Sequence, residues 1–208
     1  MKSILVINPK GGSGKTTLAT NLAGGLARMD GQGVKLWDLD RQHSALEWLS
    51  LRPTDRPLIT PLTGKPRQDG RPANEADWLV LDAPAGIHGK TLQRALKIAH
   101  KVIVPIQPSV FDMAASGDFL TELLENSALR KQQSRIGIVG MRVDPRTRAA
   151  ATLGAFLQQY DLKILTWLRD TQVYANAAFN GLSIFDLPES VGGRDTEQWR
   201  PIFNWVTA

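Results

Sequence analysis

Apolar and amphipathic segments alternate along most of the chain. Segments that are apolar throughout predict buried strands at 3–8, 34–40, 78–84, 101–106, 135–141 and 162–168. Apolar residues at helical spacing predict helices near 16–29, 44–51, 89–100, 112–126, 146–159, 172–180 and 194–207. Residues 53–72 are rich in Pro and Gly and are predicted mainly as loop. This alternation indicates an α/β fold, a doubly wound and mostly parallel sheet with helices on both faces.

The composition agrees with this fold class and excludes several kinds of functional site. A chain of 208 residues suffices for one well-filled core, so we expect a single domain over 1–208. Cysteine is absent, which excludes disulfides, thiolate zinc sites and iron–sulfur clusters, and a reducing cytoplasm is the expected location. No apolar run approaches the roughly 20 residues that span a bilayer, so we expect a soluble protein. The net charge of +5 fits an anionic partner and a solvated basic surface equally well.

The stretch NPKGGSGKTT (8–17) follows the first predicted strand and opens the first predicted helix. In such sheets ligands bind beyond the carboxyl ends of the strands, where this stretch lies. Its glycines let backbone N–H groups turn toward a phosphate, and the helix N-terminus adds partial positive charge. We expect Lys15 to neutralise the β and γ phosphates and the Thr16 hydroxyl to hold Mg²⁺. The predicted nucleotide-binding residues are Gly11, Gly12, Ser13, Gly14, Lys15, Thr16 and Thr17.

Acidic residues follow two other predicted strands. Asp82 ends an apolar strand, and we expect it to support the metal ion. Mg²⁺ prefers oxygen ligands and often keeps several waters, so a carboxylate at this strand end can hold the ion through water. Asp38 and Asp40 end another strand and share a face, since side chains two apart point the same way. Asp40 lies further along, so we expect it to orient the water that attacks the γ phosphate. Asp38 is either a second metal-side residue or a polar end of the strand.

With these residues in hand, the sequence resembles the ParA/MinD group of deviant Walker A ATPases, which are P-loop NTPases. The likeness is strongest to the short ParA-type partition and positioning proteins and covers nearly the whole chain. KGGSGKTT (10–17) fits the signature of the group at every position, and DLDRQHSALEW (38–48) resembles its next motif. WLVLDAPAG (78–86) fits the Walker B pattern, and VIVPIQPSVFD (102–112) resembles the strand and loop that follow.

The resemblance assigns a role to Lys10, a second lysine in the phosphate loop. It implies that Lys10 reaches the nucleotide of another subunit, so that two ATP molecules are sandwiched in an ATP-dependent homodimer. The charge fits this role, because a further buried cation beside Lys15 would be costly unless it met anionic charge. The expected catalytic residues are therefore Lys10, Lys15 and Asp40, the metal-side residues are Thr16, Asp82 and Asp38, and the cofactors are ATP and Mg²⁺. Hydrolysis is expected to be slow.

The sequence departs from the pattern of the group at three positions. Arg41 replaces the usual proline after Asp40, which leaves the hydrolysis rate open. Met141 stands where an asparagine commonly reads the adenine edge, and a thioether cannot supply the paired hydrogen bonds of an amide. His100 stands where aspartate is frequent, and we interpret it as a histidine that suits the negative end of a helix.

The resemblance implies a switch that binds DNA nonspecifically in its ATP state and positions a plasmid, a chromosome region or a protein cargo on the nucleoid. A ParB-like or adaptor protein is expected to stimulate hydrolysis. The predicted DNA contacts are Arg142, Arg146, Arg148, Lys163, Arg169, Arg194 and Arg200. Late segments 169–180 and 181–188 resemble the region near the nucleotide and the dimer face.

Two alternatives stay open. A MinD-like membrane-associated protein would use the C-terminal segment 195–208, whose Trp199, Ile202, Phe203 and Val206 lie at helical spacing. Its one cation, Arg200, and Pro201, which is expected to interrupt the helix, favour packing on the sheet instead. A small-molecule ligase of the dethiobiotin synthetase type would need a substrate pocket that the sequence does not reveal.

Overall fold

A computed structural model describes residues 1–29, 31–64, 77–126, 129 and 133–208. Parallel strands form one sheet of seven, in the order β3-β2-β4-β1-β5-β6-β7. The strands are β1 (Lys2–Val6), β2 (Val34–Asp38), β3 (Ile59–Leu62), β4 (Trp78–Asp82), β5 (Lys101–Ile106), β6 (Ile136–Gly140) and β7 (Lys163–Trp167). The α-helices are α1 (Lys15–Ala27), α2 (Ser44–Ser50), α3 (Gly89–Ile98), α4 (Val110–Glu125), α5 (Arg148–Gln158), α6 (Val173–Ala178) and α7 (Glu189–Thr207). Short 3₁₀ helices are η1 (Gln133–Arg135) and η2 (Ile184–Asp186).

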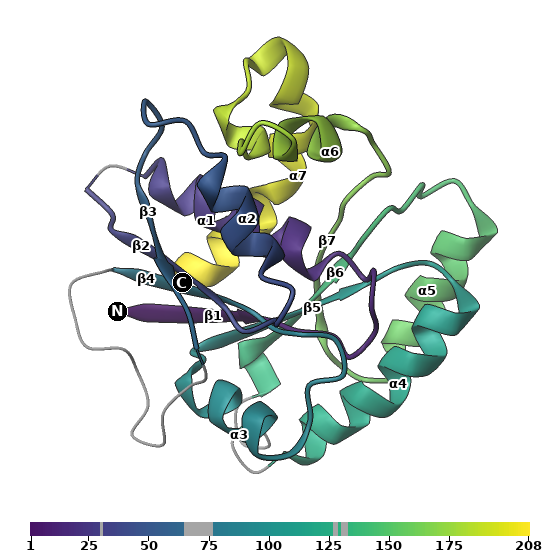
Figure 1. The fold of residues 1–208 in the computed structure, drawn as a ribbon. Coiled ribbons are helices and arrows are strands. Elements are labelled where there is room, and N and C mark those ends of the chain that lie inside the picture. Colours follow the sequence, from purple (N-terminus) through teal and green to yellow (C-terminus); the bar gives the residue numbers. More distant parts are fainter. Residues whose placement is uncertain (30, 65–76, 127–128, 130–132) are drawn as a thin grey trace.

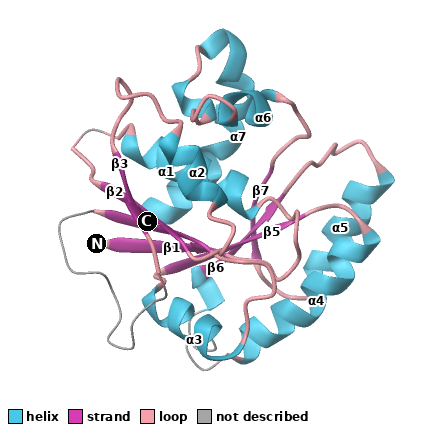
Figure 2. Cartoon of the chain, in the orientation of Figure 1, coloured by secondary structure: helices cyan, strands magenta, loops and turns pink. Residues whose placement is uncertain are grey.

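Helices cover both faces of the sheet, as Figures 1 and 2 show. Helices α1, α2, α6 and α7 lie on one face, and α3, α4 and α5 lie on the other. Side chains alternate accordingly, because Ile4 and Val6 enter the core under α1 and α7, whereas Leu5 and Ile7 enter the core over α3 and α4. The doubly wound parallel fold is thus confirmed, and all six predicted strands are present.

The predicted loop 53–72 is wrong in part, because β3 forms at its centre; residues 65–72 of that prediction lie outside the described residues. The sequence pattern did not predict this strand because it is short and contains Pro61. It lies at the edge of the sheet and pairs only with β2 in the described structure, and proline is tolerated at such an edge.

Helix α7 also differs from its prediction. It begins at Glu189 and runs through Pro201 without interruption. Proline removes the bond to the carbonyl four residues earlier, which belongs to Glu197. Both residues are exposed, so water can satisfy that carbonyl. The opposite side of the helix carries Trp199 and Ile202, which are fully buried, so the expected packing of this helix on the sheet is confirmed.

Helix α1 is buried on nearly all sides, which fixes the direction of the loop before it. Leu18, Leu22 and Leu26 enter the core, as their spacing predicts. On the other side, a Cβ on Gly24 would lie 2.4 Å from the Ser183 Cβ, and one on Gly25 would lie 2.3 Å from Phe203 Cζ. Only glycine allows η2 and α7 to approach α1 this closely.

Among the described helices, none is long and apolar enough to cross a membrane.

Candidate nucleotide site

The glycine-rich loop lies between β1 and α1 with its backbone open. Gly12 and Gly14 have φ values of 75° and 95°, a region that favours glycine. A Cβ on Gly11 or Gly12 would meet no atom within 4 Å, so this side of the loop faces open space. No side chain caps the first turn of α1, which leaves its N–H groups available. Loop and helix end therefore form a cradle for an anion.

Lys15 lies inside this cradle. Its Nζ donates to the Lys10 carbonyl at 2.8 Å and lies 3.4 Å from the Ser13 hydroxyl. Burial lowers the pKa of Lys15, and the nearby carboxylates of Asp82 and Asp40 partly oppose this shift. A buried ammonium held mainly by neutral oxygens is suited to receive a phosphate, since the added negative charge favours its charged form.

Asp82 supplies a carboxylate at the end of β4 that fits the predicted Mg²⁺. The Thr16 hydroxyl donates to its Oδ2 at 2.7 Å, whereas its buried Oδ1 has no partner among the described atoms. Burial raises the pKa of Asp82 to about 7, helped by Asp38 and Asp40 and opposed by the Thr16 hydrogen bond and Lys15. An orphaned carboxylate oxygen beside a hydroxyl is the donor set that a hard cation prefers. Thr16 and Asp82 are thus the residues placed to hold it.

Asp38 lies beside Asp82 in the register of β2 and β4 but makes different contacts. Its Oδ1 accepts from the Asp40 N–H at 2.9 Å, and its Oδ2 accepts from the N–H groups of Ala45 and Leu46 at 3.0 and 3.2 Å. Asp38 therefore ties the loop after β2 to the first turn of α2. Of the two roles left open by the sequence, these bonds favour the structural one over metal binding.

Asp40 lies at the rim of the cradle and is half-buried. Its Oδ1 accepts from the Gln42 N–H at 3.1 Å, which leaves Oδ2 available to water. Arg41 and His43, which follow it, are exposed, and His43 has a φ of 54°. The loop after β2 is thus anchored through Asp38 and presents Asp40 toward the phosphate loop.

Lys10 turns away from the cradle and is held by its own chain. Its Nζ lies 2.5 Å from Oδ2 of Asp112 in α4, and its N–H donates to Oδ1 of Asn8. The Ser109 hydroxyl donates to the same Asp112 oxygen. Motif spacing did not reveal this partner, although Asp112 closes the matched stretch 102–112. The lysine side chain is 31% exposed, so it remains accessible from outside.

A cavity of about 560 Å³ adjoins the cradle and collects most of the predicted site. Its lining includes Gly11, Gly12, Gly14, Lys15, Thr16, Thr17, Asp40, Gln107, Met141, Arg142, Arg169, Gln172 and Tyr174. Met141 packs against the loop, since a Cβ on Gly14 would lie 2.8 Å from its methyl carbon. Gln107 binds the Gly12 carbonyl through Nε2 at 2.6 Å, a contact that sequence reasoning missed.

The late segments have different positions. Residues 169–172, Tyr174 and Ala175 line this cavity, whereas 181–188 pack over α1, where Asn21 accepts from the Ile184 N–H at 2.8 Å. His100 follows the end of α3, and its Nδ1 bonds the N–H and hydroxyl of Ser3 at 2.9 and 2.7 Å. It therefore links β1 to the turn before β5.

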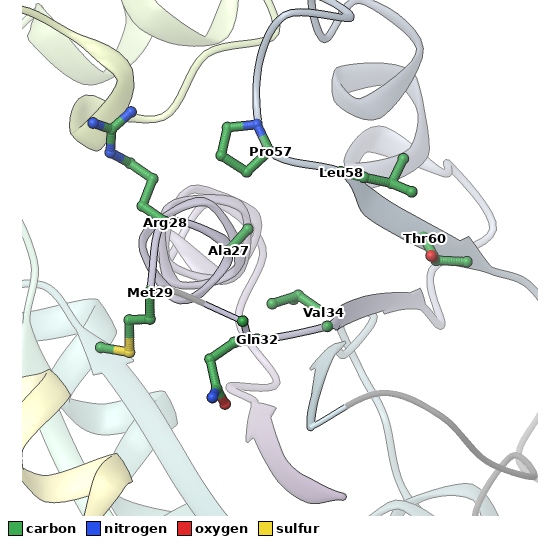
Figure 3. A pocket seen from close by; sticks show the side chains of 10 residues that line it. Ala27, Arg28, Met29, Gln32, Val34, Pro57, Leu58 and Thr60 are labelled. Atoms are coloured by element: carbon green, nitrogen blue, oxygen red, sulfur yellow. The ribbon is translucent and has the colours of Figure 1, made fainter.

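Among the described residues, the hollows that lie outside the cradle include two with different linings. One of about 680 Å³ shares Asp40 and Ala85 with the nucleotide cavity and is lined further by His43 and His88. The other, of about 570 Å³, lies between the end of α1 and the edge strands (Figure 3). Its charged residue, Arg28, lies across α1 from Leu58 and Thr60 in that view, so the hollow lacks converging polar groups.

The predicted DNA contacts differ in their availability. Exposed ion pairs join Arg142 to Asp170, Arg146 to Asp144 and Arg200 to Glu197. Arg169 is committed to Asp195, a fully buried carboxylate, through bonds of 2.7 and 2.9 Å. Arg148 and Arg194 are exposed and form no ion pair with any described residue. DNA contact stays a prediction for this set, and the geometry is least favourable for Arg169.

Comparison with known proteins places this geometry in a family. Residues 4–184 match the model described as the CobQ/CobB/MinD/ParA nucleotide binding domain. The chain is 30% identical over 201 residues to the chromosome-partitioning ATPase Soj of Thermus thermophilus, with 80% of each protein covered. It is 25% identical over 193 residues to maintenance of carboxysome distribution protein A of Halothiobacillus neapolitanus, with 89% of this chain and 87% of the relative covered.

Solved structures share the fold at lower identity. A putative plasmid partition protein of Borrelia burgdorferi, bound to AMPPNP, superposes with a TM-score of 0.73 at 19% identity over 98% of both chains. MinD of Aquifex aeolicus, in complex with MinC, gives a TM-score of 0.74 at 17% identity over 98% of this chain and 96% of that one. The chain belongs to the ParA/MinD family of nucleotide-binding ATPases.

Proposed function

We propose that this protein is an ATP-dependent dimerising ATPase switch of the ParA type, folded as one domain over 1–208. The observation that carries the proposal is the separation of the two lysines of one loop. Lys15 lies in the cradle, whereas Lys10 is held outside it by Asp112 and stays partly exposed. One lysine therefore serves the nucleotide of its own chain, and the other is available to a nucleotide on a second chain.

Within one chain, Lys15 and the loop amides bind the β and γ phosphates and exclude water from them. Thr16 and Asp82 hold Mg²⁺, which compensates phosphate charge when bound. Asp40 accepts a hydrogen bond from the attacking water and aligns it with the γ phosphate. Phosphoryl transfer depends on such positioning and on charge compensation, so a site that lacks the second subunit turns over slowly.

Between chains, Lys10 exchanges Asp112 for the phosphates of the opposite nucleotide. The exchange replaces one anionic partner by another, so the ammonium is not left unpaired when it becomes buried in the dimer. ATP supplies the γ phosphate that Lys10 contacts, and its hydrolysis removes that contact. The dimer therefore forms with ATP and dissociates after hydrolysis.

The output of the switch is nonspecific DNA binding in the ATP state, with a ParB-like or adaptor protein that stimulates hydrolysis. The names of two relatives, a chromosome-partitioning ATPase and a carboxysome distribution protein, support a role in positioning cargo. Such a protein works in the cytoplasm, on the nucleoid. Membrane attachment through α7 is less favoured, because its apolar face is already buried against the sheet. A small-molecule ligase is the least favoured alternative.

Light scattering coupled to size exclusion tests the proposal. The parent protein is expected to be a monomer without nucleotide and a dimer with ATP and Mg²⁺. Lys10→Ala is expected to bind ATP and remain a monomer, whereas Lys90→Ala, which removes an exposed lysine in α3, is expected to dimerise normally. A Lys10→Ala protein that dimerises like the parent would refute the proposed role of Lys10.

A further inference from the structure

The edge of the sheet opposite the nucleotide site carries a cation at the start of four adjacent strands. In the order β1, β5, β6, β7 these are Lys2, Lys101, Arg135 and Lys163. Neighbouring strands lie about 4.8 Å apart, so the row extends over roughly 15 Å across the sheet, and its members are staggered along the strands. We refer to these four residues as the amino-edge row. Arg135 ends η1 directly before β6, and the other three open their strands.

The strand register places the three lysines of the row on one face. Lys101 pairs with Ile4 and therefore points to the same side as Lys2, two residues before Ile4. Arg135 precedes Ile136, which pairs with Val102, so Arg135 lies level with Lys101. Lys163 pairs with Gly137, two residues after Arg135. This is the α1 and α7 face, because Ile4 packs in the core beneath those helices.

Contacts at the base of the row hold the side chains in place. The Lys101 ammonium lies 4.5 Å from the ring centre of Trp205 in α7, and the Lys2 ammonium lies 5.4 Å from that of Trp78. Lys2 also donates to the Thr207 carbonyl at 2.9 Å. Such cation–π contacts orient an ammonium without neutralising it.

Arg135 donates to the carbonyls of Ala99 and His100, which lie next to Lys101. These two bonds hold the guanidinium beside Lys101.

The three lysines of the row have little charge compensation from the described residues. Burial lowers the pKa of Lys101, and the charges of Lys163, Lys2 and Arg135 lower it further. In the described part of the chain, none of the three lysines forms an ion pair. Two acidic residues lie near the row. Asp77 is next to Lys2, whose N–H donates to its carbonyl, and its carboxylate already accepts from the Gly33 N–H. Asp161 lies two residues before Lys163 in the sequence. A partner that carries regularly spaced anions relieves the repulsion of such an array of like charges most effectively, because each cation can then lie close to an anion.

We propose that the amino-edge row is a contact surface for the phosphate backbone of double-stranded DNA. Duplex DNA carries closely spaced phosphates, and each one neutralised releases counterions, so a row of cations gains affinity cumulatively. A membrane partner is less suited, because the aromatic rings at the row, Trp78 and Trp205, are buried beneath the lysines and do not project outward. The inference rests on the DNA-binding output proposed above and names a surface for it.

The row is separate from the ATPase machinery. Lys2 begins β1, and the phosphate loop follows the other end of that strand, about 16 Å away for five residues of extended chain. Changes in the row are therefore expected to leave ATP binding intact. This separation allows DNA contact to be tested independently of the switch.

The test compares two double variants of equal charge change. Lys101→Gln/Lys163→Gln removes two cations from the row, and Lys90→Gln/Lys97→Gln removes two lysines from α3 on the opposite face. Each protein is titrated with a fluorescent DNA duplex of random sequence, with ATP and Mg²⁺, over a series of salt concentrations. A fluorescent ATP analogue and thermal melting report whether the site and the fold are intact. Anionic lipid vesicles serve as a second ligand.

At about 0.1 M salt the row variant is expected to bind DNA at least about tenfold more weakly than the α3 variant, with a salt slope lower by roughly two. ATP-analogue affinity is expected to be equal in both. If the row and α3 variants bind DNA equally, the inference is wrong while the proposed function stands. Loss of vesicle binding without loss of DNA binding would also overturn it. If the parent itself binds no DNA at low salt, both the inference and the DNA output of the proposed function fail.

Discussion

The Lys10 ammonium lies 2.5 Å from the carboxylate of Asp112 in the same chain, and the Ser109 hydroxyl donates to the same oxygen. Lys10 therefore has to leave an anionic partner before it reaches a nucleotide on another subunit. Asp112→Asn is expected to favour the ATP-dependent dimer, because it removes the competing charge while keeping a similar shape. Since the pair is partly exposed, its contribution is about 1 kcal/mol in each chain, and the two pairs of a dimer together correspond to a roughly thirtyfold lower dimer dissociation constant.

Sedimentation with ATP and Mg²⁺ over a range of protein concentrations measures this change. Asp118→Asn alters another acidic residue in α4, one that is exposed and has no ion pair with the described residues, and serves as the control. Weaker dimerisation of Asp112→Asn than of the control would show that Asp112 supports the dimer and does not compete with it.

Asp40 lines the cavity beside the phosphate loop and has one carboxylate oxygen turned to the loop after β2. Asp40→Ala is expected to bind ATP and dimerise but to lose at least about tenfold in turnover, because the attacking water is no longer oriented. Phosphate release under single-turnover conditions measures this loss. Asp55→Ala, at an exposed acid paired with Arg56, is the matched control. Unchanged turnover of Asp40→Ala would assign the water to another residue.

Asp82 makes the nucleotide-free protein sensitive to pH. Burial raises its pKa to about 7 in the folded chain, above its ordinary value in the unfolded chain. Between these two values the folded state binds more protons, so the free energy of unfolding falls as pH rises toward 7. Without nucleotide, the protein is thus expected to be more stable at pH 6 than at pH 8, by on the order of 1 kcal/mol from this group.

Urea unfolding of the parent and of Asp82→Asn at the two pH values tests this expectation. The variant keeps every histidine, so histidine titration cancels in the comparison. Asp82→Asn is expected to reduce the stability difference and to weaken the dependence of ATP binding on Mg²⁺, because the amide lacks the anionic oxygen. An equal pH dependence in both proteins would show that Asp82 is already ionised at pH 6.

Continuous motifs in the sequence point to candidate site residues, but they do not reveal contacts that only folding brings together. The composition and spacing of their residues predict the loop 10–17 and the strand before Asp82. The pairing of Lys10 with Asp112 joins residues 102 positions apart, and no local pattern encodes it. The amino-edge row was hidden for the same reason, since strand order, and not sequence order, makes β1, β5, β6 and β7 neighbours.

Arg169 illustrates a case in which residue type alone did not reveal the surroundings of the side chain. The position was grouped with the predicted DNA contacts because it is basic and late in the chain. In the structure its guanidinium makes two bonds to Asp195 of α7, whose side chain is fully buried. The Asp195 carboxylate raises the pKa of Arg169 through this hydrogen bonding, so the guanidinium keeps its positive charge.

Removing one partner of this pair is expected to destabilise the fold. Arg169→Ala leaves the Asp195 carboxylate buried without its counterion, which typically costs about 3 kcal/mol or more. For a chain of this size that loss lowers the melting temperature by roughly 10 °C. Arg194→Ala removes an exposed arginine of the same helix as Asp195 and is expected to change the melting temperature little.

The double variant Arg169→Leu/Asp195→Leu separates lost charge pairing from lost packing. It removes both charges together, so it is expected to recover much of the stability that Arg169→Ala loses. Calorimetry on the three variants measures these differences. If Arg169→Ala melts like Arg194→Ala, water or another cation compensates Asp195, and the arginine is available for the DNA contact that the sequence suggested. If it melts as expected, any loss of DNA binding in Arg169→Ala reflects the displaced α7 and cannot be assigned to a missing phosphate contact.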